Sequence, residues 1–141
     1  KNNKIFKMPK FRTMRNITPE IPTDQLEGRQ KWLTPLGLIL RKTSIDELPQ
    51  LWSVFIGDMS LIGPRPSLHN QHDLIQLRTK LGIQKIRPGI TGWAQINGRD
   101  NITLEEKVKF DEYYLNNYSF KLDLKILLLT IYKIFIFEGA Y

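Results

Sequence analysis

Two adjacent carboxylates with cations around them make the stretch from Arg41 to Pro66 the part of the chain best suited to chemistry. The stretch reads RKTSIDELPQLWSVFIGDMSLIGPRP, with Asp46-Glu47 near its start and a Pro-Arg-Pro sequence at its end. Neighbouring acids point in different directions, so one can act as a nucleophile while the other orients a metal or takes up a proton. Hard oxygen ligands beside a phosphate predict Mg²⁺ as the metal of Asp46 and Glu47, because Mg²⁺ typically combines one or two carboxylates with phosphate oxygens.

A helix cap is a second interpretation of the same residues. Ser44 and Glu47 have the spacing of a capping box, and this spacing alone favours capping over catalysis. Pro49 argues against a helix that begins at Ser44, because a proline so far inside the helix would remove a hydrogen bond. A start nearer Asp46 would bring both carboxylates to the helix N-terminus, where the dipole favours ionised acids and exposed amides attract phosphate.

Arginines accompany the two carboxylates. Arg41 precedes them by about one helical turn, and Arg65 is held between two prolines that restrict its backbone. A restricted arginine loses little entropy on binding, and its planar fork matches the oxygens of a phosphate. Arg87-Pro88-Gly89 and Asn97-Gly98-Arg99 also set a cation beside a rigid turn. Together these arginines predict a phosphate-binding site.

Composition limits the classes of protein. With 141 residues the chain fits one domain, 1–141, and its 21 Lys and Arg against 14 Asp and Glu give a net charge of +7. This charge favours an anionic partner: nucleic acid, an acidic membrane surface or a phosphorylated substrate. The absence of cysteine excludes disulfides and thiolate chemistry. His69 and His72 have no further ligand in register and are interpreted as a solvated pair.

Patterning predicts a helix-rich α+β domain with short strands. The expected extended segments or strands are 1–15 and WAQING at 93–98, the latter ending in an Asn97-Gly98 tight turn. Helices are expected from Thr34-Pro35, after Ser44 to a close near Gly57, across 67–81, and from Thr103 with Glu105 and Glu106 in its first turn. Residues 16–30 are expected to form a mobile loop, 58–66 a turn and then a stiff loop, and 87–92 a Pro/Gly region.

The segment KLDLKILLLTIYKIFIF at 121–137 is the most hydrophobic part of the chain. Its lysines and aspartate make it too short and too charged to span a bilayer, which requires about 20 mostly apolar residues. Two interpretations remain equally open. One is an amphipathic helix in the membrane interface, with lysines reaching the headgroups, and the other is a buried core helix.

Several ordered motifs resemble one known family. LRKTSIDELPQLWSVFIGDMSLIGPRP is followed by RPGITGWAQINGRD, with KFRTM at 10–14 and EGAY at 138–141. From about Lys7 to Tyr141 the chain resembles the bacterial monotopic phosphoglycosyl transferases, which initiate the synthesis of capsules, exopolysaccharides and glycoproteins.

The resemblance implies transfer of a sugar 1-phosphate from a UDP-sugar to a membrane polyprenyl (undecaprenyl) phosphate. Asp46 matches the family's nucleophile, which attacks the sugar-proximal phosphorus, forms a covalent phosphosugar intermediate and releases UMP. Glu47 would bear on Mg²⁺ or on proton handling. The resemblance also implies phosphate contacts for Arg41, Arg65 and Arg99, and for Lys10 and Arg12 of the KFRTM motif.

The resemblance implies an N-terminal re-entrant membrane helix ahead of the KFRTM motif, and we expect that segment to be missing from this sequence. The chain is therefore expected to be an N-terminally truncated catalytic domain that acts at the cytoplasmic face of a bacterial membrane. Its expected partners are UDP-sugar, polyprenyl phosphate and acidic lipids, and no nucleic acid is expected. The alternatives are a non-enzymatic basic module that binds nucleic acid or acidic lipid, and an inactive remnant that still docks on membranes.

Overall fold

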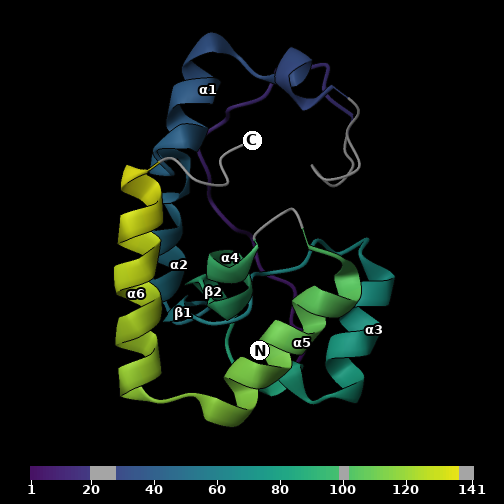
Figure 1. Cartoon of the computed structure of the whole chain (residues 1–141). Coiled ribbons are helices and arrows are strands. Elements are labelled where there is room, and N and C mark those ends of the chain that lie inside the picture. Colours follow the sequence, from purple (N-terminus) through teal and green to yellow (C-terminus); the bar gives the residue numbers. More distant parts are fainter. Residues whose placement is uncertain (20–27, 99–101, 137–141) are drawn as a thin grey trace.

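Two short parallel strands lie at the centre of the computed structural model, which describes residues 1–19, 28–98 and 102–136 (Figure 1). They are β1 (Ser60–Ile62) and β2 (Gly89–Thr91), and in their register Ser60 faces Gly89 and Ile62 faces Thr91. Parallel strands need a long crossover, which here contains α3 (His72–Lys80) and the 3₁₀ helix η4 (Ile83–Lys85). A Cβ on Gly89 would lie 2.1 Å from the Gly63 nitrogen, so only glycine permits this close approach.

Helices make up most of the remaining structure, and the prediction of a helix-rich α+β fold is confirmed. The helices outside the crossover are η2 (Arg29–Trp32), α1 (Pro35–Lys42), η3 (Ile45–Glu47), α2 (Gln50–Phe55), α4 (Trp93–Asn97), α5 (Leu104–Asn117) and α6 (Phe120–Phe135). Side-chain caps stabilise two helices at the first residues that the sequence predicted for them. The Thr34 hydroxyl accepts a hydrogen bond from the Gly37 amide at the start of α1, and Thr103 and Glu106 form a reciprocal capping box on α5.

Strand positions were predicted less well than helices. The strand expected at 93–98 is wrong, because Trp93–Asn97 forms α4 and Gly98 is the C-cap of this helix. Ala94 and Ile96 are buried, and the Trp93 ring stacks on Tyr113 of α5 with centroids 5.3 Å apart. Packing against neighbouring helices therefore overrides the local alternation. Conversely, the loop expected at 58–66 contains β1, and the Pro/Gly region at 87–92 contains β2.

The N-terminal segment is extended, as predicted, and runs along the elements before the sheet. The Phe11 amide donates to the Asp46 carbonyl at 3.0 Å, and the Thr34 amide donates to the Thr13 carbonyl at 3.0 Å. Met14 forms an isolated antiparallel bridge with Leu33. Of the loop predicted at 16–30, residues 20–27 lie outside the described part of the chain.

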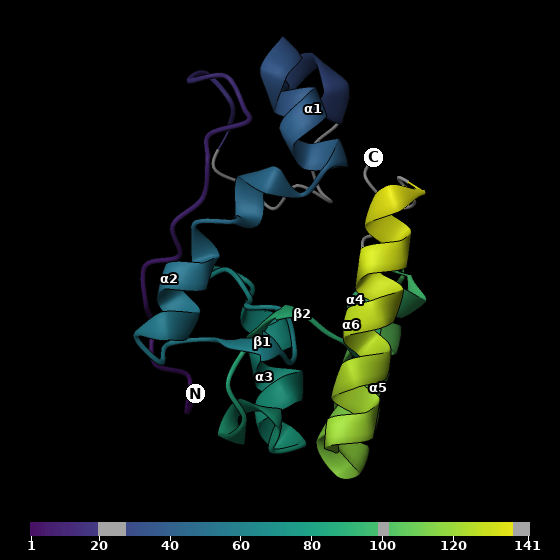
Figure 2. The same ribbon diagram turned by 90° about the vertical axis from the view of Figure 1, so that its left-hand side faces the viewer.

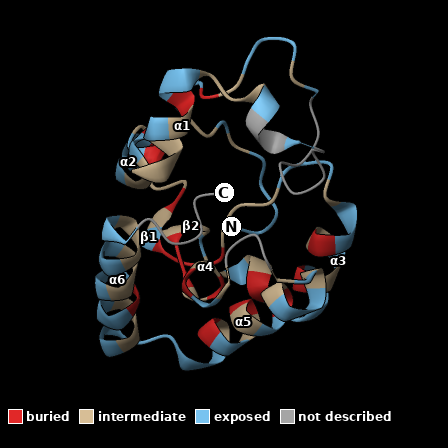
Figure 3. Ribbon diagram, turned by 45° about the horizontal axis from the view of Figure 1, so that its top comes forward, coloured by how far each residue is buried: buried red, intermediate tan, exposed pale blue. Residues whose placement is uncertain are grey.

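Many buried residues gather at β1, β2, α4 and the inner sides of α3 and α5, and further buried residues lie in α1, η3 and α2 (Figure 3). One apolar cluster joins Ile62, Ile96, Tyr114 and Ile126, and a second joins Leu74, Ile83 and Val108 between α3 and α5. The Tyr114 hydroxyl donates to the Asp123 carboxylate at 2.8 Å and links α5 to α6. Burial and this carboxylate raise the pKa of Tyr114 above its usual value, so the phenol remains a donor.

Helix α6 combines features of both interpretations of the terminal segment. Its Ile126 is fully buried, yet Phe120 is 84% exposed and Phe135 77% exposed. In Figure 1, α6 lies on the same side of the molecule as α1 and α2, and Figure 2, which views that side face on, shows α2 and α6 at its opposite edges. Further exposed apolar side chains belong to α1, α2 and the residue that follows α2: Leu36, Ile39, Leu51, Trp52, Phe55 and Ile56. Among the described residues, no helix has the length and apolarity needed to cross a bilayer.

Candidate active site

The two predicted carboxylates lie on a 3₁₀ turn between α1 and α2. Ser44, just before this turn, has φ 56° and makes no side-chain capping bond, so the alternative interpretation of Ser44 and Glu47 as a capping box, against which Pro49 argued, does not hold. Its left-handed backbone ends α1 and redirects the chain. Pro49 is the N-cap of α2, where the lack of an amide hydrogen costs no helical bond. Helix α2 therefore begins about one turn after the start predicted near Asp46.

Asp46 and Glu47 are buried, with 2% and 9% of their surface exposed. Lys10 Nζ lies 3.0 Å from Asp46 Oδ2 and 3.3 Å from Glu47 Oε1, so one ammonium is shared by both acids. The hydrogen bond from the Phe11 amide to the Asp46 carbonyl holds the segment that carries Lys10 against the turn. Burying two negative charges is costly without cations, and Lys10 supplies one of them.

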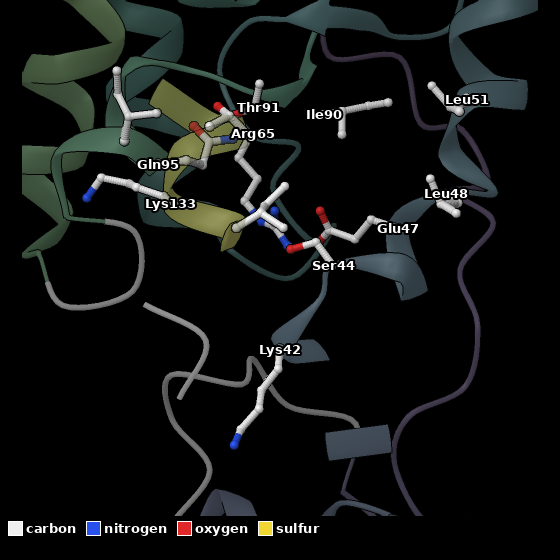
Figure 4. Close-up of a pocket in the computed structure, with 13 residues that line it drawn as sticks. Lys42, Ser44, Glu47, Leu48, Leu51, Arg65, Ile90, Thr91, Gln95 and Lys133 are labelled. Atoms are coloured by element: carbon white, nitrogen blue, oxygen red, sulfur yellow. The ribbon is translucent and has the colours of Figure 1, made fainter. Parts of the chain in front are cut away.

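Arg65 supplies the second cation. Its Nη2 donates to Glu47 Oε1 at 2.7 Å, and Figure 4 shows the Arg65 side chain reaching towards Glu47 beside Ser44. Arg65 follows β1, and Glu47 ends the 3₁₀ turn. The structure therefore brings the acidic pair and the Pro-Arg-Pro loop into direct contact, although 18 positions separate Glu47 from Arg65 in the chain.

A pocket of about 200 Å³ opens beside this cluster (Figure 4). Glu47 and Arg65 line it, together with cationic side chains of α1 and α6, Lys42 and Lys133. Apolar side chains complete the wall: Leu48, Leu51, Ile90, Ile96 and Ile134. A pocket with cations, one carboxylate and apolar walls suits an amphiphilic phosphate better than a fully hydrated ion.

The other predicted phosphate ligands have different surroundings. Arg41 donates its Nε to the Thr13 hydroxyl at 3.0 Å, beside the segment that carries Lys10. Arg12 is exposed and hydrogen bonds to Asn16. Arg99 lies outside the described residues, as does the EGAY motif at 138–141.

The acidic pair has the chemistry of a Mg²⁺ site. Asp46 Oδ2 is buried without a hydrogen-bond partner, and its contact is the ion pair with Lys10. Within the described ranges no group of three or more acidic or histidine side chains is placed so that it could hold a metal ion. Two carboxylates alone suit Mg²⁺, which usually completes its shell with water and substrate phosphates. The residues present therefore fit the metal predicted from the sequence.

Sequence reasoning missed the polar groups on the far wall of the pocket. Gln95, on α4, lines the pocket, and both polar atoms of its buried amide lack a hydrogen-bond partner. The hydroxyls of Thr91 and Thr130 lie 2.8 Å apart on the same wall. Thr91 and Gln95 lie inside the RPGITGWAQINGRD motif, but their residue types alone indicate no role, because their approach to Thr130 depends on the packing of α6 against α4 and β2.

The chain matches known sequences over nearly its whole length. A family model described as bacterial sugar transferase matches residues 1–137. The uncharacterized sugar transferase EpsL of Bacillus subtilis is 46% identical, over 98% of this chain and 67% of EpsL. Galactosyl transferase CpsE of Streptococcus agalactiae is 40% identical, over 99% of this chain and 34% of CpsE.

A further relative is the UDP-glucose:undecaprenyl-phosphate glucose-1-phosphate transferase of Escherichia coli. It is 38% identical to this chain, over 99% of the chain and 32% of the relative. The chain thus spans about two thirds of EpsL and about one third of the two longer relatives.

Proposed function

Because the chain belongs to the bacterial sugar transferase family, we propose that it transfers a sugar 1-phosphate from a UDP-sugar to undecaprenyl phosphate. The printed names of relatives support this reaction, since two of them are UDP-glucose:undecaprenyl-phosphate glucose-1-phosphate transferases and a third is a UDP-galactose-lipid carrier transferase. The observation that carries the proposal is the buried acidic pair that shares Lys10 and meets Arg65 at the rim of a pocket.

The proposed reaction has two displacements at one phosphorus. An Asp46 carboxylate oxygen attacks the sugar-proximal phosphorus, the bond from that phosphorus to the bridging oxygen breaks, and UMP leaves with the bridging oxygen. The product is an acyl phosphate that joins Asp46 to the sugar. A phosphate oxygen of undecaprenyl phosphate then attacks the same phosphorus, which releases the Asp46 carboxylate and forms the lipid-linked diphosphate sugar. A carboxylate nucleophile splits one difficult transfer into two easier ones.

The cations around Asp46 support this assignment. Lys10 Nζ lies 3.0 Å from Oδ2 of the proposed nucleophile, and Arg65 contacts Glu47, the residue next to that nucleophile. Fixed cations stabilise charge that develops on a transferring phosphoryl group, which is the main task of a protein in such chemistry. Since Asp46 Oδ2 is buried under Lys10, we infer that Lys10 turns towards the donor phosphates when they bind and uncovers the nucleophile.

Glu47 differs from Asp46 because it lines the pocket and accepts a hydrogen bond from Arg65. We assign to it the orientation of Arg65 and, with Asp46, the binding of Mg²⁺. When bound, Mg²⁺ would neutralise phosphate charge and hold the diphosphate oxygens beside the acidic pair. Two carboxylates, Asp46 and Glu47, are enough for such a site, because Mg²⁺ usually takes one or two carboxylates and completes its shell with phosphate oxygens and water.

The lipid substrate requires access from a membrane, and the exposed apolar side of the molecule suits that purpose. We propose that the side formed by α1, α2 and α6 rests on the cytoplasmic face of the bacterial membrane. Leu48 and Leu51, in and just before α2, and Ile134 of α6 are among the residues that line the pocket. An apolar surface with lysines nearby is typical of peripheral binding to acidic lipids.

Trapping the covalent intermediate tests the function. The protein is incubated in liposomes with a UDP-sugar and Mg²⁺ but without lipid acceptor, and intact and digested protein are analysed by mass spectrometry. We expect one equivalent of UMP to be released and the peptide that contains Asp46 to gain the mass of the sugar phosphate. Undecaprenyl phosphate should then remove the added mass.

Asp46→Asn should abolish both UMP release and the added mass. The control variant Asp58→Asn, at an acid outside the site, should retain both. UMP release that requires the lipid acceptor from the start would contradict the two-step reaction. Binding of DNA without any UMP release would instead favour a basic binding module. A panel of UDP-sugars in the same assay identifies the donor sugar.

A further inference from the structure

The Pro-Arg-Pro loop is held from behind by a buried ion pair that the reaction described above does not use. Arg78 of α3 donates its Nε and Nη2 to Asp111 Oδ2 of α5, at 2.9 Å and 2.5 Å. Its third nitrogen, Nη1, donates to the backbone carbonyl of Arg65 at 2.8 Å. Arg78 is 8% exposed and Asp111 1% exposed, so neither side chain is available to a substrate in this arrangement.

The loop needs such contacts because of its sequence. Pro64 and Pro66 have no amide hydrogen, so this stretch is anchored mainly through its carbonyls. The Pro64 carbonyl accepts from the Gly89 amide of β2 at 2.9 Å, and the Arg65 carbonyl accepts from Arg78. Two successive carbonyls are thus tied to two different elements, which fixes the direction in which the Arg65 side chain leaves the backbone.

We propose that Arg78, oriented by Asp111, is a positioning residue that sets Arg65 against Glu47 for phosphoryl transfer. The inference rests on the proposed function, because it names a residue that tunes the same site. The contacts form one series: Asp111 holds Arg78, Arg78 holds the Arg65 carbonyl, and the Arg65 guanidinium meets Glu47 at 2.7 Å. Small errors in the position of such a group can reduce turnover by about 100-fold.

The surroundings of Asp111 support the order of this series. Burial raises the pKa of Asp111, while the Arg78 guanidinium opposes that shift, so the carboxylate depends on its partner to remain ionised. Because Asp111 accepts hydrogen bonds from Nε and Nη2 of Arg78, the planar guanidinium is held in one orientation, in which its Nη1 points at the Arg65 carbonyl. A lysine could pair with Asp111 but could not also reach the Arg65 carbonyl with the same planar geometry.

Arg78→Lys is therefore the informative variant, since it retains the buried charge pair and removes the contact to Arg65. Val108→Ala is the matched control, because Val108 of α5 packs in the apolar cluster with Leu74 of α3 and makes no polar side-chain contact that it could lose. We expect Arg78→Lys to reduce kcat for UMP release by roughly 10- to 100-fold, with KM for the UDP-sugar changed less. Val108→Ala should lower Tm at least as much and leave kcat within about 2-fold.

A double-mutant cycle separates positioning from simple stabilisation. In an Arg65→Ala background, Arg78→Lys should cost no further activity, because the residue it positions is gone. Equal losses of kcat in both backgrounds would overturn the proposal and leave the pair a structural contact between α3 and α5. The proposal would also be overturned if Val108→Ala lowered kcat as much as Arg78→Lys does, because loss of stability alone would then explain the loss of activity.

A second measurement does not depend on activity. Amide hydrogen exchange in the segment around the loop, including the Leu68 amide that donates to the Gln71 side chain, should accelerate at least 10-fold in Arg78→Lys relative to Val108→Ala. If the protein released no UMP from any UDP-sugar, the proposed function would fail, and this exchange measurement would still decide whether Arg78 holds the loop. Unchanged exchange would overturn the proposal.

Discussion

Arg65 Nη2 lies 2.7 Å from Glu47 Oε1, although 18 positions separate the two residues in the chain. The contact joins the loop after β1 to the 3₁₀ turn before α2, and both residues line the same pocket. A charge-assisted bond of this length fixes the guanidinium beside the acidic pair, where a donor phosphate would meet it.

Arg65→Lys should reduce kcat/KM for UMP release by about 100- to 1,000-fold, the usual cost of removing one preorganised donor from a site that stabilises developing charge. Lysine retains the charge but not the planar fork. Steady-state kinetics measure the loss, and Arg15→Lys, at an exposed arginine, serves as the control. Comparable rates for the two variants would exclude a role for the guanidinium.

Lys10→Met should lower the free energy of unfolding by about 1–3 kcal/mol, because two buried carboxylates lose the ammonium they share. Urea unfolding at neutral pH measures the change. Lys7→Met, at an exposed lysine of the same segment, should have little effect. In an Asp46→Asn background the cost of Lys10→Met should shrink, and an unchanged cost would show that the ion pairs do not stabilise the fold.

Gln95→Leu should raise the free energy of unfolding by about 1 kcal/mol, because it replaces a buried amide whose polar atoms lack partners with an apolar side chain of similar size. The same change should raise KM for the UDP-sugar about 10-fold if the substrate completes the hydrogen bonds of that amide. Gln76→Leu, on the exposed side of α3, is the control for both measurements. If Gln95→Leu were more stable and fully active, the Gln95 amide would not contact the substrate.

Chelation of divalent cations should abolish UMP release, and excess Mg²⁺ should restore it, because two carboxylates and the donor phosphates together suit this ion. The assay uses the protein in liposomes, first with EDTA and then with Mg²⁺ added back. Full activity in EDTA would show that Lys10 and Arg65 alone neutralise the phosphates.

The double variant Trp52→Ser with Phe55→Ser should reduce co-sedimentation with liposomes that contain acidic lipid by at least 10-fold, since both rings are exposed on α2 and would insert into the interface. Leu68→Ser with Leu81→Ser removes two exposed leucines near α3, away from this side of the molecule, and should leave binding unchanged. Equal losses in both double variants would point to non-specific adhesion rather than to one membrane-binding side.

Local chemistry made some features readable from the sequence alone. The Thr34-Pro35 start and the Thr103 capping box depend on residues within one turn of each other, so both helices could be predicted at their first residues. The acidic pair and the Pro-Arg-Pro loop could be proposed as a phosphate site from residue type, and the family could be identified from long ordered motifs. These features need no knowledge of what packs against them.

Tertiary structure decided which of these residues meet and what supports them. The sequence could not distinguish a strand from a helix at Trp93–Asn97, because the burial of Ala94 and Ile96 against other elements outweighs local alternation. Nor could it pair Ser60–Ile62 with Gly89–Thr91 across an intervening helix. Lys10 meets Asp46 across 36 positions, and Arg78 meets Asp111 across 33. Such contacts depend on how distant segments pack. The acidic pair could therefore be found in the sequence, whereas the arrangement of the cations around it is visible only in the fold.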